Sequence, residues 1–286
     1  MIVLGGAGFI GSAFVKLSKN PVVIDKLTYA ADLRRIPGVE FYRRDICSDF
    51  SLIAEKESLI VNFAAETHVD KSIQDPTQFL TTNVLGLSNV LNICIKYNIK
   101  YIHISTDEVY GEILEGEAKE DWPLNPSNPY AASKAAGDLL VKSYIRTYGL
   151  KAIIIRPCNN YGPYQNEEKF IPNSILNGVS LYGDGSQVRE WLYVDDCVKG
   201  IFCIINKGEY GQVYNLGSGF LDANLNVAKR IGKITYVKDR PGHDRRYSMD
   251  SSKIRGLGWK PKVSFKDGLR KTIKFYLINN KKKCYT

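Results

Sequence analysis

The 286-residue chain has few of the residues whose abundance would indicate metal or disulfide chemistry. It contains only three histidines, and its six cysteines form no CxxC pair and have no histidine at the spacing of a zinc site. We therefore expect no metal. We interpret the cysteines as free thiols, most of them buried, in the reducing environment of the cytoplasm.

Long apolar runs are also missing. No run approaches the roughly 18 to 20 residues that a membrane-spanning helix needs, so we expect no membrane association. An apolar strand is predicted to begin at Ile2, which leaves no room for a signal peptide. No internal repeat or low-complexity tract is evident.

The charge is unbalanced, with 39 Lys and Arg against 30 Asp and Glu, a net charge of +9. Part of the excess lies at Arg43-Arg44, Arg245-Arg246 and residues 281–283. The aromatic and basic pattern of a nucleic-acid-binding module is absent. We interpret the excess as solvated surface charge that also favours an anionic small substrate, and we expect no nucleic-acid partner.

Near the start of the chain lies a glycine loop. The apolar run 2–4 precedes Gly5-x-x-Gly8-x-x-Gly11, and a helical stretch follows. In a strand–loop–helix of this kind, Gly5 allows the tight turn, Gly8 lets the backbone approach a pyrophosphate, and Gly11 lets the helix pack on the strand. The N–H groups at the start of the helix can then bind phosphates.

A second apolar strand ends in Asp25, twenty residues after Gly5. An acid at this offset suits the hydroxyls of an adenine ribose and repels a 2′-phosphate, which favours NAD over NADP. Lys26, the next residue, weakens this inference slightly. Ala64 and Ala65 end a further apolar strand and are small enough for a cofactor to lie against them.

Strands and helices alternate along the first half of the chain. This alternation predicts a Rossmann-type α/β fold, a doubly wound parallel sheet, with a smaller C-terminal substrate-binding lobe. We assign residues 1–156 to the NAD-binding domain, which residues 188–216 would rejoin, and 157–286 mainly to the lobe. Strands are predicted at 2–4, 22–25, 39–42, 59–65, 101–105, 152–156, 188–194 and 213–216, and helices at 77–97, 130–148, 195–206 and 265–277.

A set of acid–base groups follows the predicted strand 101–105. Thr106, Asp107 and Glu108 come directly after it, where an open α/β sheet binds its ligands. Tyr130 and Lys134 are four residues apart in a predicted helix and share one face of it. A hydroxyl, two carboxyls, a phenol and an ammonium group make a plausible catalytic set.

With the glycine loop and Tyr130-x-x-x-Lys134 both in place, the chain resembles the extended short-chain dehydrogenase/reductase superfamily over nearly its whole length. Several segments narrow the resemblance to the dTDP-glucose 4,6-dehydratase family. These segments are DKLTYA (25–30), ETHVDKS (66–72), STDEVYG (105–111), NNYGPY (159–164) and DRPGHDRRY (239–247).

This resemblance implies a mechanism and a homodimer. Tyr130 would take the proton of the sugar 4-hydroxyl as C4 is oxidised by NAD, with Lys134 lowering the pKa of the phenol and Thr106 bonding the 4-oxygen. Glu108 would remove the C5 proton, and Asp107 would protonate the departing C6 hydroxyl. Because adjacent like charges oppose joint ionisation, the proton can stay on Asp107. The product would be a 4-keto-6-deoxy sugar for 6-deoxyhexose biosynthesis.

The resemblance also implies binding residues. NAD would contact Gly5, Gly8, Phe9, Ile10, Gly11, Asp25, Lys26, Asp45, Ile46, Ala64, Ala65, Thr67, Thr82, Tyr130, Lys134 and Asn160. The nucleotide-sugar would contact Thr67, Thr106, Asn159, Lys169, Arg189, Asn224, Arg240 and His243. Relative to the family, the chain is short in the ranges 32–39 and 111–126 and has Ala31 where Gly is usual.

Two other functions stay open on the sequence alone. A nucleotide-sugar 4-epimerase or decarboxylase would share most motifs but would not need the Asp107–Glu108 pair. A non-catalytic NAD-binding scaffold would share the fold, but it would be expected to have lost catalytic side chains that this chain retains. Thymine as the nucleotide base follows from the resemblance alone.

Overall fold

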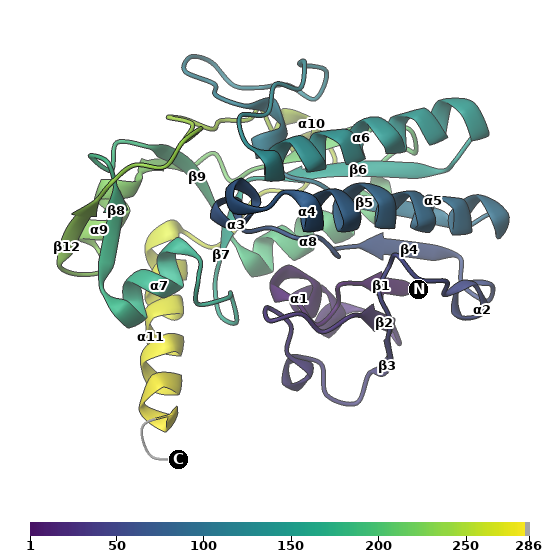
Figure 1. Ribbon diagram of the computed structural model, residues 1–286, viewed down its shortest axis with the longest axis horizontal. Coiled ribbons are helices and arrows are strands. Elements are labelled where there is room, and N and C mark those ends of the chain that lie inside the picture. The colour runs from purple at the N-terminus through teal and green to yellow at the C-terminus, as the bar shows by residue number, and fades with distance from the viewer. Residues whose placement is uncertain (284–286) are drawn as a thin grey trace.

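A seven-stranded parallel sheet forms the centre of the molecule in the computed structural model, which describes residues 1–283 (Figure 1). The strand order is β10-β6-β5-β4-β1-β2-β3, the arrangement of a dinucleotide-binding doubly wound fold. The strands are β1 (Ile2–Leu4), β2 (Val22–Asp25), β3 (Glu40–Arg43), β4 (Leu59–Asn62), β5 (Lys100–Ile104), β6 (Ala152–Pro157) and β10 (Val213–Leu216).

Helices cover both faces of this sheet, because the central strands are apolar on both sides. In β1, Val3 packs with the cluster that includes Phe14 and Ile201, whereas Ile2 and Leu4 pack with the cluster that includes Leu87. The elements of this part are α1 (Phe9–Leu17), η1 (Leu33–Arg35), α2 (Ser51–Ala54), α3 (Val69–Gln74), α4 (Thr77–Leu80), η2 (Thr81–Gly86), α5 (Leu87–Lys96), η3 (Asp107–Tyr110), α6 (Pro129–Tyr148), α8 (Val194–Lys207) and α10 (Ser252–Gly256).

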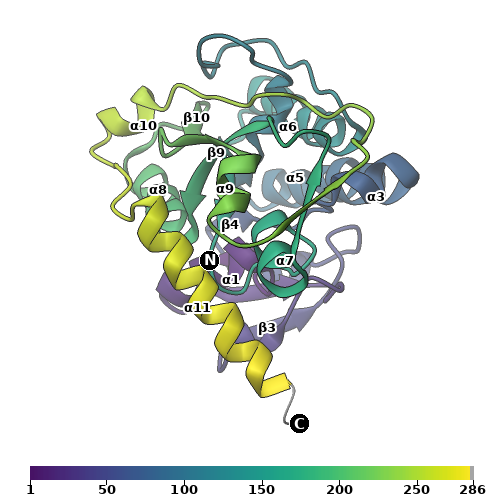
Figure 2. The same ribbon diagram turned by 90° about the vertical axis from the view of Figure 1, so that its left-hand side faces the viewer.

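The second part of the molecule is smaller and lies beside the carboxyl ends of the main strands (Figure 2). A three-stranded sheet in the order β11-β9-β7 and a two-stranded sheet of β12 and β8 form it, with helices packed on them. Its elements are β7 (Asn159–Tyr161), α7 (Phe170–Asn177), β8 (Val179–Tyr182), β9 (Val188–Tyr193), β11 (Leu221–Ala223), α9 (Asn224–Lys229), β12 (Ile234–Val237) and α11 (Phe265–Lys283).

The observed elements differ from the predicted ones in several places. The predicted helix 77–97 is divided into α4, the π-helical η2 and α5. The fourth strand ends at Asn62 rather than at residue 65, since Asn62 accepts a hydrogen bond from Ala64 N through its side chain at 2.9 Å and turns the chain. Of the segment 188–216, β10 joins the main sheet and α8 packs on α1, but β9 belongs to the small sheet.

A buried ion pair joins two elements of the main domain. Arg156 on β6 and Asp138 on α6 are both fully buried, and Arg156 Nε donates to Asp138 Oδ2 at 2.8 Å. Arg156 Nη1 also donates to the Tyr110 hydroxyl at 2.7 Å, which links η3 to the same pair. These contacts fix η3, and with it the segment at the end of β5.

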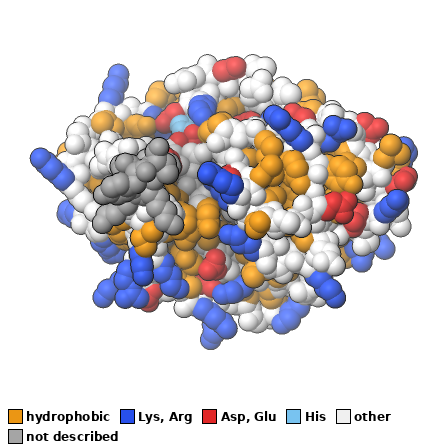
Figure 3. All heavy atoms as spheres, turned by 90° about the horizontal axis from the view of Figure 1, so that it is seen from below, with side chains coloured by type: hydrophobic (Ala, Val, Ile, Leu, Met, Phe, Trp, Pro, Cys, Tyr) orange, Lys and Arg blue, Asp and Glu red, His pale blue; other side chains and the backbone are white. Residues whose placement is uncertain are grey.

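On the face drawn in Figure 3, Lys and Arg side chains lie among hydrophobic and acidic ones, and several of them gather at the lower left. That the excess charge is solvated surface charge stays an interpretation. Within residues 1–283, no helix combines the length and the apolar character required to cross a lipid bilayer.

We predict that Asp138→Ala lowers the free energy of unfolding by about 3 kcal/mol or more, because it leaves the Arg156 guanidinium buried without its carboxylate. Urea unfolding followed by circular dichroism measures this. Arg34→Ala is the control, since Arg34 pairs with Asp32 on the exposed surface. A similar shift for both variants would contradict the role of burial.

Candidate active site

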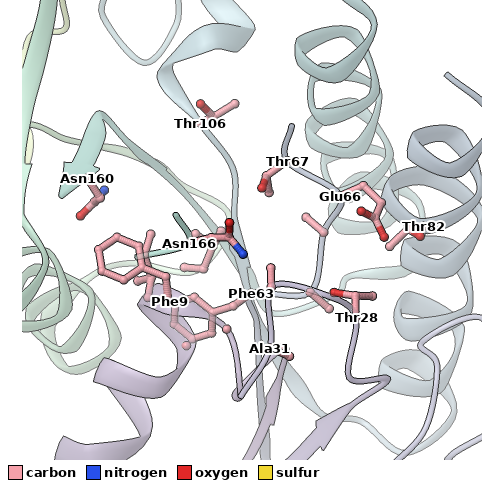
Figure 4. A pocket seen from close by; sticks show the side chains of 18 of the residues that line it. Phe9, Thr28, Ala31, Phe63, Glu66, Thr67, Thr82, Thr106, Asn160 and Asn166 are labelled. Atoms are coloured by element: carbon pink, nitrogen blue, oxygen red, sulfur yellow. The ribbon is translucent and has the colours of Figure 1, made fainter. Parts of the chain in front are cut away.

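A cleft lies at the carboxyl ends of the main strands, between the two parts of the molecule (Figure 4). Phe9, Phe63 and Thr82 come from the main domain, and Asn160 and Asn166 approach from the segment after β6. Every residue predicted to contact NAD lines this cleft, as do Thr67, Thr106, Asn159 and Lys169 of the predicted substrate set. Their contacts with a ligand stay predictions.

The glycine loop between β1 and α1 is closely packed. Gly5 has φ +70°, and a Cβ there would lie 2.5 Å from the backbone N of Ala64. A Cβ on Gly11 would lie 2.2 Å from the Gly5 carbonyl oxygen. Gly8 precedes α1 without any capping side chain, so the first N–H groups of the helix are available to an anion.

Asp25, at the end of β2, holds the glycine loop in place. Its carboxylate accepts hydrogen bonds from Ala7 N at 3.0 Å and from Leu27 N at 2.8 Å. Burial raises the pKa of Asp25, and the two backbone hydrogen bonds and the nearby Lys26 oppose that rise.

Lys26, which could have attracted a 2′-phosphate, already has partners. Its Nζ lies 3.3 Å from Glu66 Oε1 and 3.7 Å from Asp45 Oδ2, and it donates to the Thr82 hydroxyl at 3.3 Å. Glu66 and Thr82 face each other across this point in Figure 4. The lysine charge is therefore balanced within the chain, which supports the preference for NAD over NADP.

Several polar atoms in the cleft are buried and have no hydrogen-bond partner within residues 1–283. They include Ser105 Oγ, Asn160 Oδ1 and Gln165 Oε1. Buried polar groups are normally paired, so such atoms suit a polar ligand. Together with the glycine loop and Asp25, they make a site whose chemistry fits a dinucleotide such as NAD.

The chain turns sharply between the end of β5 and η3. Thr106 begins this turn, and its hydroxyl accepts a hydrogen bond from Glu108 N at 3.3 Å and donates to Asp107 Oδ1 at 3.1 Å. Gly111 ends it with φ +73°, and a Cβ there would clash with the Asn125 carbonyl oxygen at 1.9 Å. The turn brings both carboxyls to the cleft.

Burial favours the protonated form of Asp107. Only 3% of the residue is exposed, and burial raises the pKa of Asp107 well above its ordinary value, with further contributions from the Glu108 and Glu190 carboxylates. Burial contributes more to this rise in pKa than the neighbouring Glu108 charge, which the sequence alone indicates as the cause. Asp107 Oδ2 has no hydrogen-bond partner among the described residues and can donate to a ligand.

Tyr130 and Lys134 lie on the first turns of α6. Asn128 caps this helix by accepting a hydrogen bond from Ala131 N at 2.9 Å, and Pro129 occupies its first position. Lys134 Nζ donates to the Ile104 carbonyl oxygen at 2.7 Å, and burial lowers the pKa of Lys134 to about 8.

The expectation that Lys134 lowers the pKa of the phenol needs correction for the free chain. Burial raises the pKa of Tyr130 above its ordinary value, and the Glu108 carboxylate raises it further. A hydrogen bond with Thr106 acts in the opposite direction but is the weaker influence. The lysine ammonium is directed at the end of β5 instead.

The remaining predicted substrate residues lie in the second part, outside the lining of this cleft. Arg189 is buried, donates to the Asp244 carbonyl oxygen at 2.8 Å, and is close enough to Asp107 to lower its pKa slightly. Arg240 pairs with Asp70 at 3.2 Å. Asn224 begins α9, and His243 Nδ1 lies 2.6 Å from Asp239 Oδ1.

Some residues of the cleft were not predicted. Gln165, Asn166 and Glu168 line it from the loop after β7, and Glu66 lines it beside Thr67. Gln165, Asn166 and Glu168 come shortly after the motif 159–164, and Glu66 opens the motif 66–72. This proximity to the motifs is the sequence feature that could have predicted their place in the cleft. Within residues 1–283, no cluster of three or more His, Cys, Asp or Glu side chains is placed to hold a metal ion.

Comparison with known proteins decides the family. The model of the GDP-mannose 4,6-dehydratase family matches residues 2–272. A dTDP-glucose 4,6-dehydratase from Haemophilus influenzae is 40% identical over 98% of both chains. The chain belongs to the nucleotide-sugar 4,6-dehydratase family.

Relatives of this dehydratase are found in archaea and among solved structures. A low-salt glycan biosynthesis protein of Haloferax volcanii, Agl12, is 43% identical over 97% of this chain and 98% of its own. DesIV, a dTDP-glucose 4,6-dehydratase of Streptomyces venezuelae solved with NAD and TYD bound, has a TM-score of 0.93 at 41% identity and covers 98% of this chain and 97% of its own. Both likenesses extend over the whole fold.

The dehydratase chain is shorter than many relatives. Its alignment with the Haemophilus influenzae protein runs over 333 positions, whereas the chain has 286 residues, so the relative contains segments that this chain lacks. That these segments fall in the ranges 32–39 and 111–126 stays a prediction.

We predict that Asp107→Asn stabilises the dehydratase at neutral pH while removing an acid from its site. The raised pKa of Asp107 means that folding takes up a proton above pH ~4, so the wild-type stability falls as the pH rises. The advantage of the neutral Asn should grow by up to about 1.4 kcal/mol per pH unit above that pH. Urea unfolding at a series of pH values measures it, and a pH-independent difference would contradict the protonated state.

Proposed function

We propose that this dehydratase converts dTDP-glucose into dTDP-4-keto-6-deoxyglucose and water. The observation that carries the proposal is the meeting of Asp107, Glu108, Tyr130 and Lys134 in one cleft with a glycine loop suited to NAD. An acid, a base and a phenol beside a dinucleotide site are the groups that this reaction requires.

The residues divide the proton transfers between them. NAD, when bound, supplies the transient hydride acceptor and donor that makes the overall reaction redox-neutral. Tyr130 takes the proton of the C4 hydroxyl, and Thr106 bonds the oxygen on which charge develops. Glu108 then removes the C5 proton, and Asp107 gives its proton to the C6 hydroxyl, which leaves as water.

Opposite protonation states of the two carboxyls are the condition for this chemistry. Burial, with the Glu108 and Glu190 carboxylates nearby, raises the pKa of Asp107, and this favours the protonated form that an acid at C6 requires. The positive charge of bound NAD, beside that of Lys134, would favour the phenolate of Tyr130, whose pKa is high in the free chain.

An epimerase function is the second candidate, because the fold does not exclude it. A UDP-glucose 4-epimerase of Thermus thermophilus, solved with NAD, has a TM-score of 0.90 at 31% identity. Epimerisation at C4 needs neither a C5 base nor a C6 acid. The buried Asp107 beside Glu108 would be a costly feature without such a task, so the site favours the dehydratase.

We further propose that the two parts of the molecule bind different ligands. The main sheet with residues 1–156, β10 and α8 would hold NAD, and the smaller lobe would hold the nucleotide and its diphosphate. Arg189 and Arg240 supply the forked donors that suit a diphosphate. Thymine as the base is supported by the names of the relatives.

We also propose that the protein is a cytoplasmic homodimer. Cys94, Cys158 and Cys197 are buried free thiols, as a reducing compartment allows. Leu80, Leu85, Leu139 and Tyr148 are more than half exposed on α4, η2 and α6, which pack beside one another. Such an apolar surface supports association with a second copy.

Glu108→Gln should form the oxidised 4-keto hexose once per site and then stop, because no base remains for C5. Stopped-flow absorbance of NADH and mass spectrometry of the sugar nucleotide measure the two steps. Tyr130→Phe is the companion variant, and it should show no NADH at all. Loss of water at the wild-type rate by Glu108→Gln would contradict the assigned base.

Leu139→Arg combined with Leu85→Arg should convert the proposed dimer to a monomer, because both changes place a positive charge on the apolar surface and the like charges of two facing copies repel. Sedimentation velocity measures the mass. Leu52→Arg, at an exposed leucine away from this surface on α2, is the control. A monomeric wild-type protein would contradict the proposal.

A further inference from the structure

One carboxylate connects segments from both sides of the cleft. Glu168 lies in the loop between β7 and α7 and lines the cleft. Its Oε1 accepts a hydrogen bond from the Tyr29 hydroxyl at 2.9 Å, and its Oε2 accepts one from Lys71 Nζ at 3.2 Å. Tyr29 follows β2 and Lys71 belongs to α3, so all of its partners here come from the main domain.

The partners of Glu168 also contact each other. Lys71 Nζ lies 3.4 Å from the centre of the Tyr29 ring, and His68 Nε2 lies 3.6 Å from Glu168 Oε2. Only 17% of the Glu168 side chain is exposed, whereas Tyr29 is 53% exposed. The cluster of Tyr29, His68, Lys71 and Glu168 therefore stands at the rim of the cleft, with its carboxylate turned inward.

Neighbouring contacts hold the same loop at both ends. Lys169 Nζ donates to the Thr67 carbonyl oxygen at 2.7 Å, and Lys16 lies 4.2 Å from the centre of the Tyr164 ring. The residues on either side of Tyr29, Thr28 and Ala30, line the cleft. The loop thus crosses from the smaller lobe to the loops that surround the predicted dinucleotide site.

We infer that Glu168 is a positioning residue that retains the dinucleotide during turnover by fastening the loop 162–169 across the cleft. The inference rests on the proposed function, in which C4 is oxidised and C6 is reduced within one catalytic cycle. If the reduced cofactor escaped between these steps, the site would be left without the hydride donor that C6 requires, and the sugar would be released unfinished. A carboxylate that joins the two sides opposes that escape.

Glu168→Gln tests the inference, because it keeps the shape of the side chain and removes the charge that pairs with Lys71. The dissociation rate of bound NAD, measured without substrate by dilution and trapping, should rise by about tenfold. Tyr29→Phe should raise it less. Glu115→Gln makes the same change at an exposed position outside this loop, which does not line the cleft, and should leave the rate unchanged.

Turnover gives a second readout that a purely structural role would not produce. With dTDP-glucose, Glu168→Gln should release NADH and lose activity with time, and excess NAD should restore it. An unchanged NAD dissociation rate, or lost activity that NAD does not restore, would overturn the inference. If the wild-type chain turned over no dTDP-glucose, the proposed function would fail, whereas the dissociation assay would still decide the role of Glu168.

Discussion

Burial of Asp107 beside Glu108 is the constraint on which the site depends. Burial of this carboxyl, of which 3% is exposed, raises the pKa of Asp107 and so favours its protonated form. The chain has to maintain this arrangement against its cost, and it does so with the Thr106 hydroxyl, the sharp turn at Gly111 and the Tyr110 hydroxyl bonded to Arg156. The turn that carries the two carboxyls is therefore also bonded to the buried ion pair of the main domain.

The architecture and the dinucleotide cleft could be predicted because they depend on local sequence. Apolar strands, glycines that a Cβ would obstruct, and the four-residue spacing of Tyr130 and Lys134 each leave a direct pattern. Parallel strands then bring their carboxyl ends to one edge, so residues far apart in sequence, such as Asp25 and Thr106, line one cleft. The observed strand order β3-β2-β1-β4-β5-β6-β10 is that of a doubly wound fold, which the alternation of strands and helices predicts.

The second lobe and the rim of the cleft could not be predicted in the same way. The strands of the second lobe are short, and β11 pairs antiparallel with β9 about thirty residues away in the sequence. No local periodicity of apolar residues therefore predicts this pairing. The π-helical η2, which packs against α6, interrupts a segment whose sequence predicts one continuous helix. The contacts of Glu168 join residues 29, 71 and 168, a distance along the chain that no spacing rule covers.

The direct measurement of the central claim is the protonation state of Asp107. Infrared difference spectroscopy between the wild-type protein and Asp107→Asn, at neutral pH, isolates the carboxyl band of this residue. The account predicts the C=O band of a protonated carboxylic acid in the wild-type protein, absent from the variant. A carboxylate band from Asp107 at neutral pH would contradict it, since the site would then lack its acid.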